Sequence, residues 1–364
     1  MRVEELNYHL PQELIAQRPL PARDSSRLLV LSRESGEWSD RRFAELPELL
    51  RGNELLVFNN ARVLPARLFG HRAGVHAQRP SRKTAREHLT GTVEVFLTRH
   101  IDGNRWQALV RPGRKIPVGE RISFGGGELT CEILARGELG LRTIALASHD
   151  DRSVAEHIER LGHVPLPPYI DRADEDSDRE RYQTVYAQEP RAVAAPTAGL
   201  HFTPDILRRI HQRGCETCEI ALSVGLGTFQ PVHTDSFEQH HIHTEAYEIS
   251  PETAEKINLA KGQNRPVLAV GTTVVRALED AAGRSAPRGP VAIVPGAAEA
   301  ELYILPGHHF RVVDALLTNF HLPKSTLLAL VASFAGKQNI LAAYRHAVAE
   351  GYRFYSYGDC MLIR

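Results

Sequence analysis

The sequence lacks the features that would assign it to an extracellular or membrane class. Its four cysteines, Cys131, Cys215, Cys218 and Cys360, are too few and too scattered for a disulfide framework, which favours a reducing compartment. No apolar run reaches the roughly 18 residues of a membrane helix, and acidic residues interrupt the N-terminus where a signal peptide needs an apolar core. We therefore expect a cytoplasmic protein without a membrane segment.

The sequence also lacks an excess of charge of either sign, because Lys plus Arg and Asp plus Glu both number 44. Net charge thus gives no reason to expect nucleic-acid or membrane binding over the whole surface. One local cluster exists: between Arg62 and His88, seven basic residues accompany a single acid, Glu87. This run is either a solvated loop or a contact to a nucleic-acid backbone.

The length of 364 residues favours two domains, and the pattern of apolar and turn residues changes along the chain. The apolar runs 27–31 and 54–60 are typical of buried strands in an α/β sheet. From about 66 to 147, strand follows strand, separated by turn residues, as in a small β-barrel. A helix ending at Gly162, an acidic loop and alternating strands and helices follow. We expect an α/β domain, 1–65 and 148–364, interrupted by a β-barrel domain, 66–147.

Three segments in the second half of the chain share one pattern, which is a strand, a loop of small or hydroxyl residues, and then a helix. The loops are "AAPTAGLHFTP", the residues around Gly271, and "HLPK". In the first, Thr203 is a suitable N-cap and Gly214 ends the helix. Such loops gather at the carboxyl edge of an α/β sheet, so we expect the three to line one cleft.

Histidines and a carboxylate are concentrated in "HHIHTEAYEI", where His241, His243 and Glu245 would alternate onto one face of an extended chain. Such a face would bind zinc, hold a coupled general acid and base, or form the polar outer face of an edge strand. The pattern alone leaves the three open. Cys215 and Cys218 are weak candidates for a metal or redox pair, because residues three apart on a strand point to opposite faces.

Two loops have both a functional and a structural interpretation. "VGLGTFQPV" offers glycines for close backbone approach and Phe229 for stacking, or is only a turn, and it lacks the third glycine of a dinucleotide fingerprint. Gly271, Thr272 and Thr273 at a helix start suit a carboxylate or phosphate, with Arg276 adding charge, or only cap the helix.

A series of segments in order along the chain resembles the S-adenosylmethionine:tRNA ribosyltransferase-isomerase family of queuosine synthesis. The segments are "YHLPQELIAQRP" with "RDSSRLLVL", "LLVFNNARVLPARL", "DRERYQTVYA" with "AVAAPTAGLHFT", "VGLGTFQPV", "HTEAYEIS", "AVGTTVVRALE", "LLTNFHLPKSTLLALVASFAG" and "YRFYSYGDCMLI". They span nearly the whole chain. One departure is "HRAGVHAQRPSRKTAREHLTG", which is longer and more basic than the glycine-rich turn expected there.

The resemblance implies an α/β domain with a barrel-like sheet, interrupted by a small β-barrel domain. It also implies a reaction in which the ribosyl part of S-adenosylmethionine moves to 7-aminomethyl-7-deazaguanine at the wobble position of tRNA, giving epoxyqueuosine, adenine and methionine. S-adenosylmethionine is then a consumed substrate. We expect no other cofactor, no metal, no membrane partner and a monomer.

The chemistry implied by the resemblance has three proton transfers, which need imidazoles or carboxylates that titrate near neutral pH. The catalytic candidates in the matching motifs are His201, His243, Glu245 and His321. The candidates for binding the substrates are Arg62, Thr197, Gly199, Phe202, Gly225, Gly227, Thr228, Phe229, Gly271, Thr272, Thr273, Arg276, Asn319 and Lys324. The candidates for tRNA contact are Arg79, Arg82, Lys83 and Arg86.

Other classes stay open on the sequence alone. They are a metal-dependent hydrolase built on His241, His243 and Glu245, a non-enzymatic RNA-binding module that uses the basic run, and an S-adenosylmethionine methyltransferase. The missing glycine fingerprint after the first strands disfavours the methyltransferase.

The basic run generates a testable prediction. Replacing Arg79, Arg82, Lys83 and Arg86 with Ser should weaken tRNA binding and flatten the slope of log affinity against log salt by up to about 0.7 to 0.9 per lost contact, because each phosphate contact releases a counterion. Turnover at saturating tRNA should be nearly unchanged. A variant that keeps the parent's salt slope would show that the run is a solvated loop.

Overall fold

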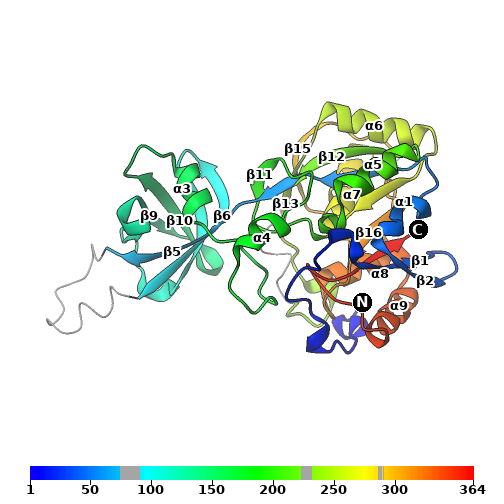
Figure 1. The fold of residues 1–364 in the computed structure, drawn as a ribbon, viewed down its shortest axis with the longest axis horizontal. Helices are drawn as coiled ribbons and strands as arrows, with labels where there is room; N and C mark the ends of the chain where they lie inside the picture. Colours follow the sequence, from blue (N-terminus) through cyan, green and yellow to red (C-terminus); the bar gives the residue numbers. More distant parts are fainter. Residues whose placement is uncertain (74–90, 223–231, 286–288, 290) are drawn as a thin grey trace. The chain divides into compact units, whose positions relative to one another are not determined.

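The computed structural model describes residues 1–73, 91–222, 232–285, 289 and 291–364. They form two units (Figure 1). The larger comprises Met1–Arg62, Leu166–Ala173 and Glu180–Arg364, and the smaller comprises Val63–Pro165 and Asp174–Arg179. The smaller unit includes helix α3 (Val154–Leu161), which the expected insert leaves out.

A mixed sheet is the centre of the larger unit. Its spatial order is β15 (Gly296–Ala300), β13 (Glu245–Ile249), β12 (Glu216–Leu222), β3 (Leu55–Asn59), β14 (Val267–Val270), β16 (Ala315–Asn319), β17 (Cys360–Ile363), β1 (Arg27–Leu31) and β2 (Trp38–Arg42). Strands β12, β3, β14 and β16 run parallel, with antiparallel neighbours β13 and β17 on either side. The continuous apolar runs of β3, β14 and β16 suit this central position, because parallel strands are buried on both faces.

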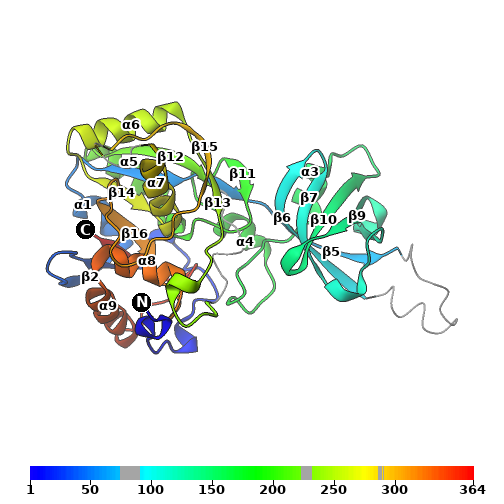
Figure 2. The same ribbon diagram turned by 180° about the vertical axis from the view of Figure 1, so that it is seen from behind.

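Helices cover both faces of this sheet (Figures 1 and 2). One face packs against α6 (Pro251–Gly262), α7 (Thr272–Ser285), α8 (Thr326–Ala335) and α9 (Lys337–Ala349), and the other packs against α1 (Leu46–Leu49) and α5 (Pro204–Gln212). Cys218 belongs to the first core and Cys215 to the second, as their spacing predicts. The expected α/β class is confirmed.

The smaller unit is a closed barrel in the order β10 (Leu141–Ser148), β7 (Arg105–Arg111), β6 (Thr92–Asp102), β5 (Arg67–Arg72), β8 (Arg121–Phe124) and β9 (Leu129–Arg136). The inserted β-barrel is thus confirmed. Two cations of the basic run pair within it: Arg67 with Glu94 at 2.6 Å, and Arg72 with the buried Glu120 at 2.5 Å. These two side chains therefore stabilise the barrel.

Local sequence signals set several element ends. Thr203 accepts a hydrogen bond from the backbone nitrogen of Ile206 at 3.2 Å and caps α5, and Gly214 follows the helix with φ of 96°, where glycine avoids strain. The acidic segment expected to be a loop instead contains the short helix α4 (Asp176–Arg181), because Asp178 accepts a hydrogen bond from the backbone of Glu175.

Strands β4 (Ala61–Val63) and β11 (Glu189–Ala192) form a separate two-stranded sheet. Within the described ranges, no single helix is long and apolar enough to cross a membrane; α8 and α9 meet that test only together, as a pair bent by 115°.

Candidate active site

Three loops of the larger unit meet at one cavity, which we call the loop cavity. Its lining consists of residues 195–198, 271–273 and 318–322, together with Ser325, Leu327, Tyr169, Tyr355 and Ser356. The loops after β14 and β16 meet there because parallel strands place their carboxyl ends at the same sheet edge. The third loop contains the short turn η8 (Thr197–His201). The convergence of these three loops is therefore as the sequence predicts.

The loop after β14 requires its glycine. Gly271 has a φ of 102°, a left-handed conformation that side-chain-bearing residues rarely adopt, and its N–H donates to the oxygen of Leu317 on β16 at 2.8 Å. This contact joins the loop after β14 to the neighbouring strand β16. Thr272 and Thr273 follow at the start of α7 and line the loop cavity and a second cavity as well.

The side-chain amide of Asn319 connects separate segments behind the loop cavity. Its Nδ2 donates to the backbone oxygens of Tyr355 (3.2 Å) and Asp359 (3.4 Å), and lies 3.2 Å from Nε2 of His201. Because the two backbone oxygens only accept hydrogen bonds, they fix which way the amide points. His201 must then present an unprotonated Nε2, which leaves its proton on Nδ1, 3.0 Å from Ser26 Oγ.

Two of the predicted catalytic histidines are buried and stay neutral. Desolvation lowers the pKa of His201 to about 4 and that of His321 to about 3. The expectation that these rings titrate near neutral pH is therefore wrong. His321 lines the loop cavity and shares a hydrogen bond of 2.9 Å with Thr318 Oγ1, whereas His201 lies outside the lining and contacts Asn319, which belongs to it.

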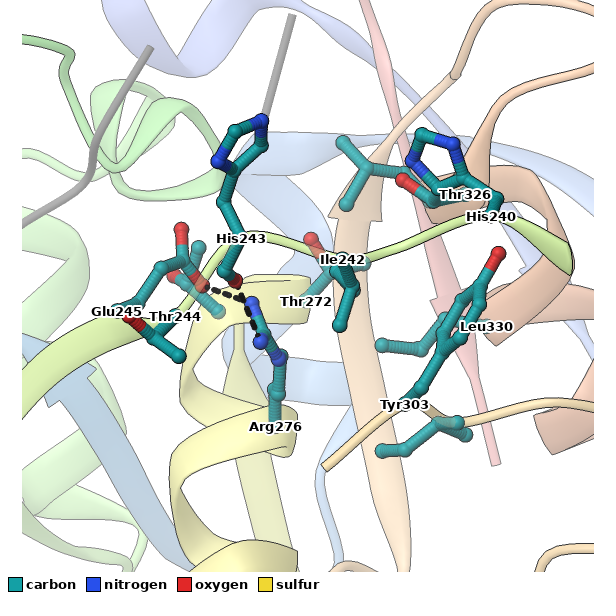
Figure 3. A pocket seen from close by; sticks show the side chains of 13 residues that line it. His240, Ile242, His243, Thr244, Glu245, Thr272, Arg276, Tyr303, Thr326 and Leu330 are labelled. Atoms are coloured by element: carbon teal, nitrogen blue, oxygen red, sulfur yellow. Dashed lines mark hydrogen bonds and ion pairs between the residues drawn. The ribbon is translucent and has the colours of Figure 1, made fainter. Parts of the chain in front are cut away.

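The other two catalytic candidates lie at the second cavity, which we call the strand cavity (Figure 3). It is lined by His240, residues 242–245, Thr272, Thr273, Arg276, Tyr303, Ile304, Thr326, Leu327 and Leu330. His243 is exposed and its ring points away from Arg276, while Glu245 is buried and points toward that arginine. The expected acid–base pair of His243 and Glu245 on one face is therefore not what the structure shows.

Arg276 holds the segment that carries these residues. Its Nη1 donates to Glu245 Oε2 at 3.0 Å, and Nη2 donates to the backbone oxygens of His243 (2.7 Å) and Ala300 (2.8 Å). Nε donates to the oxygen of Leu302 at 2.9 Å. Four of the five N–H bonds of the guanidinium are thus used inside the protein, and Arg276, predicted to add charge beside a bound carboxylate or phosphate, lines the strand cavity.

The remaining predicted substrate-binding residues divide into those at a cavity and those away from it. Thr197 lines the loop cavity. Gly199 serves packing, because a Cβ there would lie 2.0 Å from the hydroxyl of Tyr186. Phe202 is fully buried in the second core, and Lys324 Nζ pairs with Glu4 at 2.5 Å.

The other predicted residues fall into two groups. Arg62 lies on β4 and is absent from both linings as described. The loop residues Gly225, Gly227, Thr228 and Phe229, and the basic residues Arg79, Arg82, Lys83 and Arg86, lie outside the described residues.

Sequence reasoning missed the aromatic side of the loop cavity. Tyr169 and Tyr355 have ring centroids 4.5 Å apart, and the Tyr169 hydroxyl lies 2.6 Å from Ser356 Oγ. The motif "YRFYSYGDCMLI" was the available signal. It lies more than 300 residues along the chain from β1, and nothing in the sequence indicates that it reaches the same sheet edge as Gly271.

The proposed zinc ligands do not come together among the residues that the structure describes. The one group there with metal-binding side chains close enough is Glu128, Asp150 and His157 in the barrel, whose ligand atoms lie within 4.8 Å of one another. Within it, His157 Nε2 already lies 2.8 Å from Asp150, and Glu128 pairs with Arg160.

The fold and the loop cavity place the chain among α/β proteins whose ligand site lies at the carboxyl ends of parallel strands. Its family is narrower than this class. Residues 3–363 match the family model described as "Queuosine biosynthesis protein", and the chain belongs to that family of enzymes.

The chain is similar over its full length to proteins named "S-adenosylmethionine:tRNA ribosyltransferase-isomerase". The relative from Solibacter usitatus (strain Ellin6076) is 53% identical over 367 residues, and that from Moorella thermoacetica (strain ATCC 39073 / JCM 9320) is 46% identical over 363 residues; both alignments cover 100% of each chain. A crystal structure of S-adenosylmethionine tRNA ribosyltransferase from Thermotoga maritima is 34% identical, with a TM-score of 0.53 and coverage of 99% of this chain and 100% of that chain.

The low pKa of His201 predicts a window of acid sensitivity. A histidine whose pKa falls on folding contributes stability above its unfolded pKa of about 6.5, and that stability is lost as pH falls toward the folded value of about 4. Over this window His201 contributes up to about 1.4 kcal/mol per pH unit. His201→Gln should therefore lose less stability than the parent between those values, measured by urea unfolding, while exposed His9→Gln should follow the parent. Equal slopes for parent and His201→Gln would contradict the assignment.

The buried pair of Arg276 and Glu245 predicts a large effect on stability. Arg276→Met should lower the free energy of unfolding by about 3 to 5 kcal/mol, because it leaves a buried carboxylate without its counter-charge. The matched control is Lys256→Met, which breaks the exposed pair with Glu252 and should cost less than about 1 kcal/mol. Similar losses in the two variants, measured by chemical denaturation, would show that the Arg276 contacts are not structural.

Proposed function

We propose that this enzyme transfers and isomerises the ribosyl moiety of S-adenosylmethionine onto 7-aminomethyl-7-deazaguanine at the wobble position of tRNA. The products are epoxyqueuosine in the tRNA, adenine and methionine. S-adenosylmethionine is a consumed substrate, and the steps are proton transfers and displacements at carbon that need no metal. The enzyme acts in the cytoplasm as a monomer.

The observation that carries this proposal is the similarity to the ribosyltransferase-isomerases, which extends over 100% of the chain at 53% identity in one relative. The geometry supports it in one respect. The loop cavity and the strand cavity share Thr272, Thr273 and Leu327, so an elongated substrate such as S-adenosylmethionine is able to occupy both. Helix α7 begins at this shared wall, where its positive end favours negative or polar groups.

Two of the three histidine candidates for the general base are unsuited to accept a proton near neutral pH. The pKa of His201 and of His321 lies well below neutral, so each is a weak base. His243 is an exposed imidazole at the strand cavity, and we assign it the role of general base. Glu245 helps to position His243, because it pairs with the same Arg276 guanidinium that donates to the backbone oxygen of His243.

The proposed reaction predicts which products appear together. Incubation with S-adenosylmethionine and tRNA carrying the aminomethyl-deazaguanine should release adenine and methionine in step with a mass gain on the tRNA, and only when both substrates are present. Chromatography and mass spectrometry of the tRNA measure these quantities. Methylated tRNA with S-adenosylhomocysteine would overturn the proposal.

The role of His243 predicts a loss of turnover without a loss of fold. His243→Ala should lower kcat by at least about a hundredfold, the lower limit for lost general acid–base catalysis, because the ring is exposed and its removal leaves no buried gap. The control is His241→Ala, which removes an exposed neighbouring imidazole and should keep parental turnover. A loss in both variants together with bound zinc would favour a metal site, and near-normal turnover of His243→Ala would exclude the ring from catalysis.

A further inference from the structure

The lining of the loop cavity contains no Asp, Glu, Lys or Arg among the residues that the structure describes. Its polar groups are hydroxyls, the amide of Asn319 and the ring of His321, and burial keeps that ring neutral by lowering its pKa. Tyr169, Tyr355 and Phe320 supply aromatic surface. A neutral, flat heterocycle suits such a cavity, whereas an ammonium group would lose its hydration without gaining a counter-charge.

Two buried polar atoms of this lining have no hydrogen-bond partner among the described residues. They are Oδ1 of Asn319, which only accepts, and the hydroxyl of Tyr355, which is able to donate. A buried polar group left without a partner costs about 1 to 3 kcal/mol. Two such groups on one cavity therefore point to a ligand that offers a donor and an acceptor.

The amide of Asn319 is not free to turn away and find another partner, and the ring of Tyr355 packs against Tyr169 on a backbone that is itself held in place. The nitrogen of Asn319 is fixed by the oxygens of Tyr355 and Asp359 and by His201, so its oxygen keeps the opposite side of the amide. Tyr355 has a φ of 70°, a left-handed conformation that is strained for a residue with a side chain.

Three hydrogen bonds maintain the strained backbone of Tyr355. Its oxygen accepts from Asn319 and from the N–H of Gly358 at 2.9 Å, and its N–H donates to Phe320 at 3.3 Å. Strain held by surrounding contacts is typical of ligand clamps.

We propose that Asn319 Oδ1 and the Tyr355 hydroxyl together recognise the amino edge of the adenine of S-adenosylmethionine. The exocyclic amino group donates to Asn319, and Tyr355 donates to the ring nitrogen beside that amino group, N1 or N7. His201 is a positioning residue for Asn319. This inference rests on the proposed function, since it takes its ligand from that reaction.

The adenine fits these groups better than the other parts of the substrates. The methionine part carries an ammonium, which needs a counter-charge that the described lining lacks. The start of α7, which favours its carboxylate, lies at the wall that the loop cavity shares with the strand cavity. The Tyr355 hydroxyl stays protonated, because burial raises its pKa, and so remains a donor to a ring nitrogen.

The test measures binding of free adenine, purine, 1-deazaadenine and 7-deazaadenine to the full chain by calorimetry. Wild type should bind adenine about tenfold more tightly than purine, which lacks the amino group. It should also bind adenine about tenfold more tightly than the one deaza compound that lacks the ring nitrogen contacted by Tyr355. Tyr355→Phe should bind adenine and that deaza compound with similar affinity, and it should still bind adenine more tightly than purine. Because the hydroxyl has no partner among the described residues, this variant should be at least as stable as the parent.

The matched control is Tyr186→Phe, which removes another buried hydroxyl without a described partner, from a ring in the second core that is absent from both cavity linings. It should bind all four compounds like the wild type. His201→Gln should reduce the preference for adenine over purine, because the Asn319 amide loses the ring that positions it, and general destabilisation does not produce this change.

The outcomes separate this inference from the proposed function. If the wild type releases adenine from S-adenosylmethionine but Tyr355→Phe discriminates among the compounds as the wild type does, this inference alone is overturned. The same holds if adenine shows no binding up to its solubility limit. If no adenine is released under the assay above, the proposed function fails, whatever the binding series shows.

Discussion

The amide of Asn319 is the contact on which the candidate site depends. It stands at the end of β16 and joins that strand to η8, through His201, and to the segment before β17, through the oxygens of Tyr355 and Asp359. Asp359 in turn accepts hydrogen bonds from the backbone nitrogens of Arg27 and Arg353, both at 2.8 Å. One side chain thus connects segments that are far apart in sequence. The amide, the backbone oxygens and the neutral ring that form these hydrogen bonds carry no charge and need no counter-ion.

The two cavities differ in their electrostatics although they share a wall. The loop cavity is neutral in its described lining, while the strand cavity contains Arg276, Glu245 and His243. Most of this charge is used internally, because Arg276 pairs with Glu245 and binds the backbone around it. A buried ion pair of this kind is weak evidence for stability and stronger evidence for a fixed geometry, since it holds β13 and β15 in register.

Much of the fold was predictable because the sequence signals are local. The apolar runs of β1 and β3, the cap at Thr203 and the strand succession of the barrel depend on neighbouring residues, and each appears in the structure. The strand β15 was not predictable, since Gly296–Ala300 reads "GAAEA" and pairs only because β13 and Arg276 provide partners.

The site was partly predictable for the same reason. Loops at strand ends converge by topology, which placed Thr197, Gly271 and Asn319 at one cavity. Burial, however, is a property of the folded chain, so the neutral state of His201 and His321 and the pairing of Arg276 had no sequence signal. The left-handed backbone of Tyr355 depends on distant hydrogen bonds and was equally hidden.

The position of β17 has a consequence for how the chain folds during synthesis. Residues 360–363 form a strand between β16 and β1, and so link the β1–β2 hairpin to the rest of the sheet. Until residues 360–363 leave the ribosome, the edge of β1 that pairs with β17 has no described neighbour. Its strand partner lies more than 300 positions later in the chain. The barrel, by contrast, has all its strands by residue 148. The smaller unit is therefore able to fold while the larger one is still being made, and the nascent larger sheet carries open strand edges of the kind that chaperones protect.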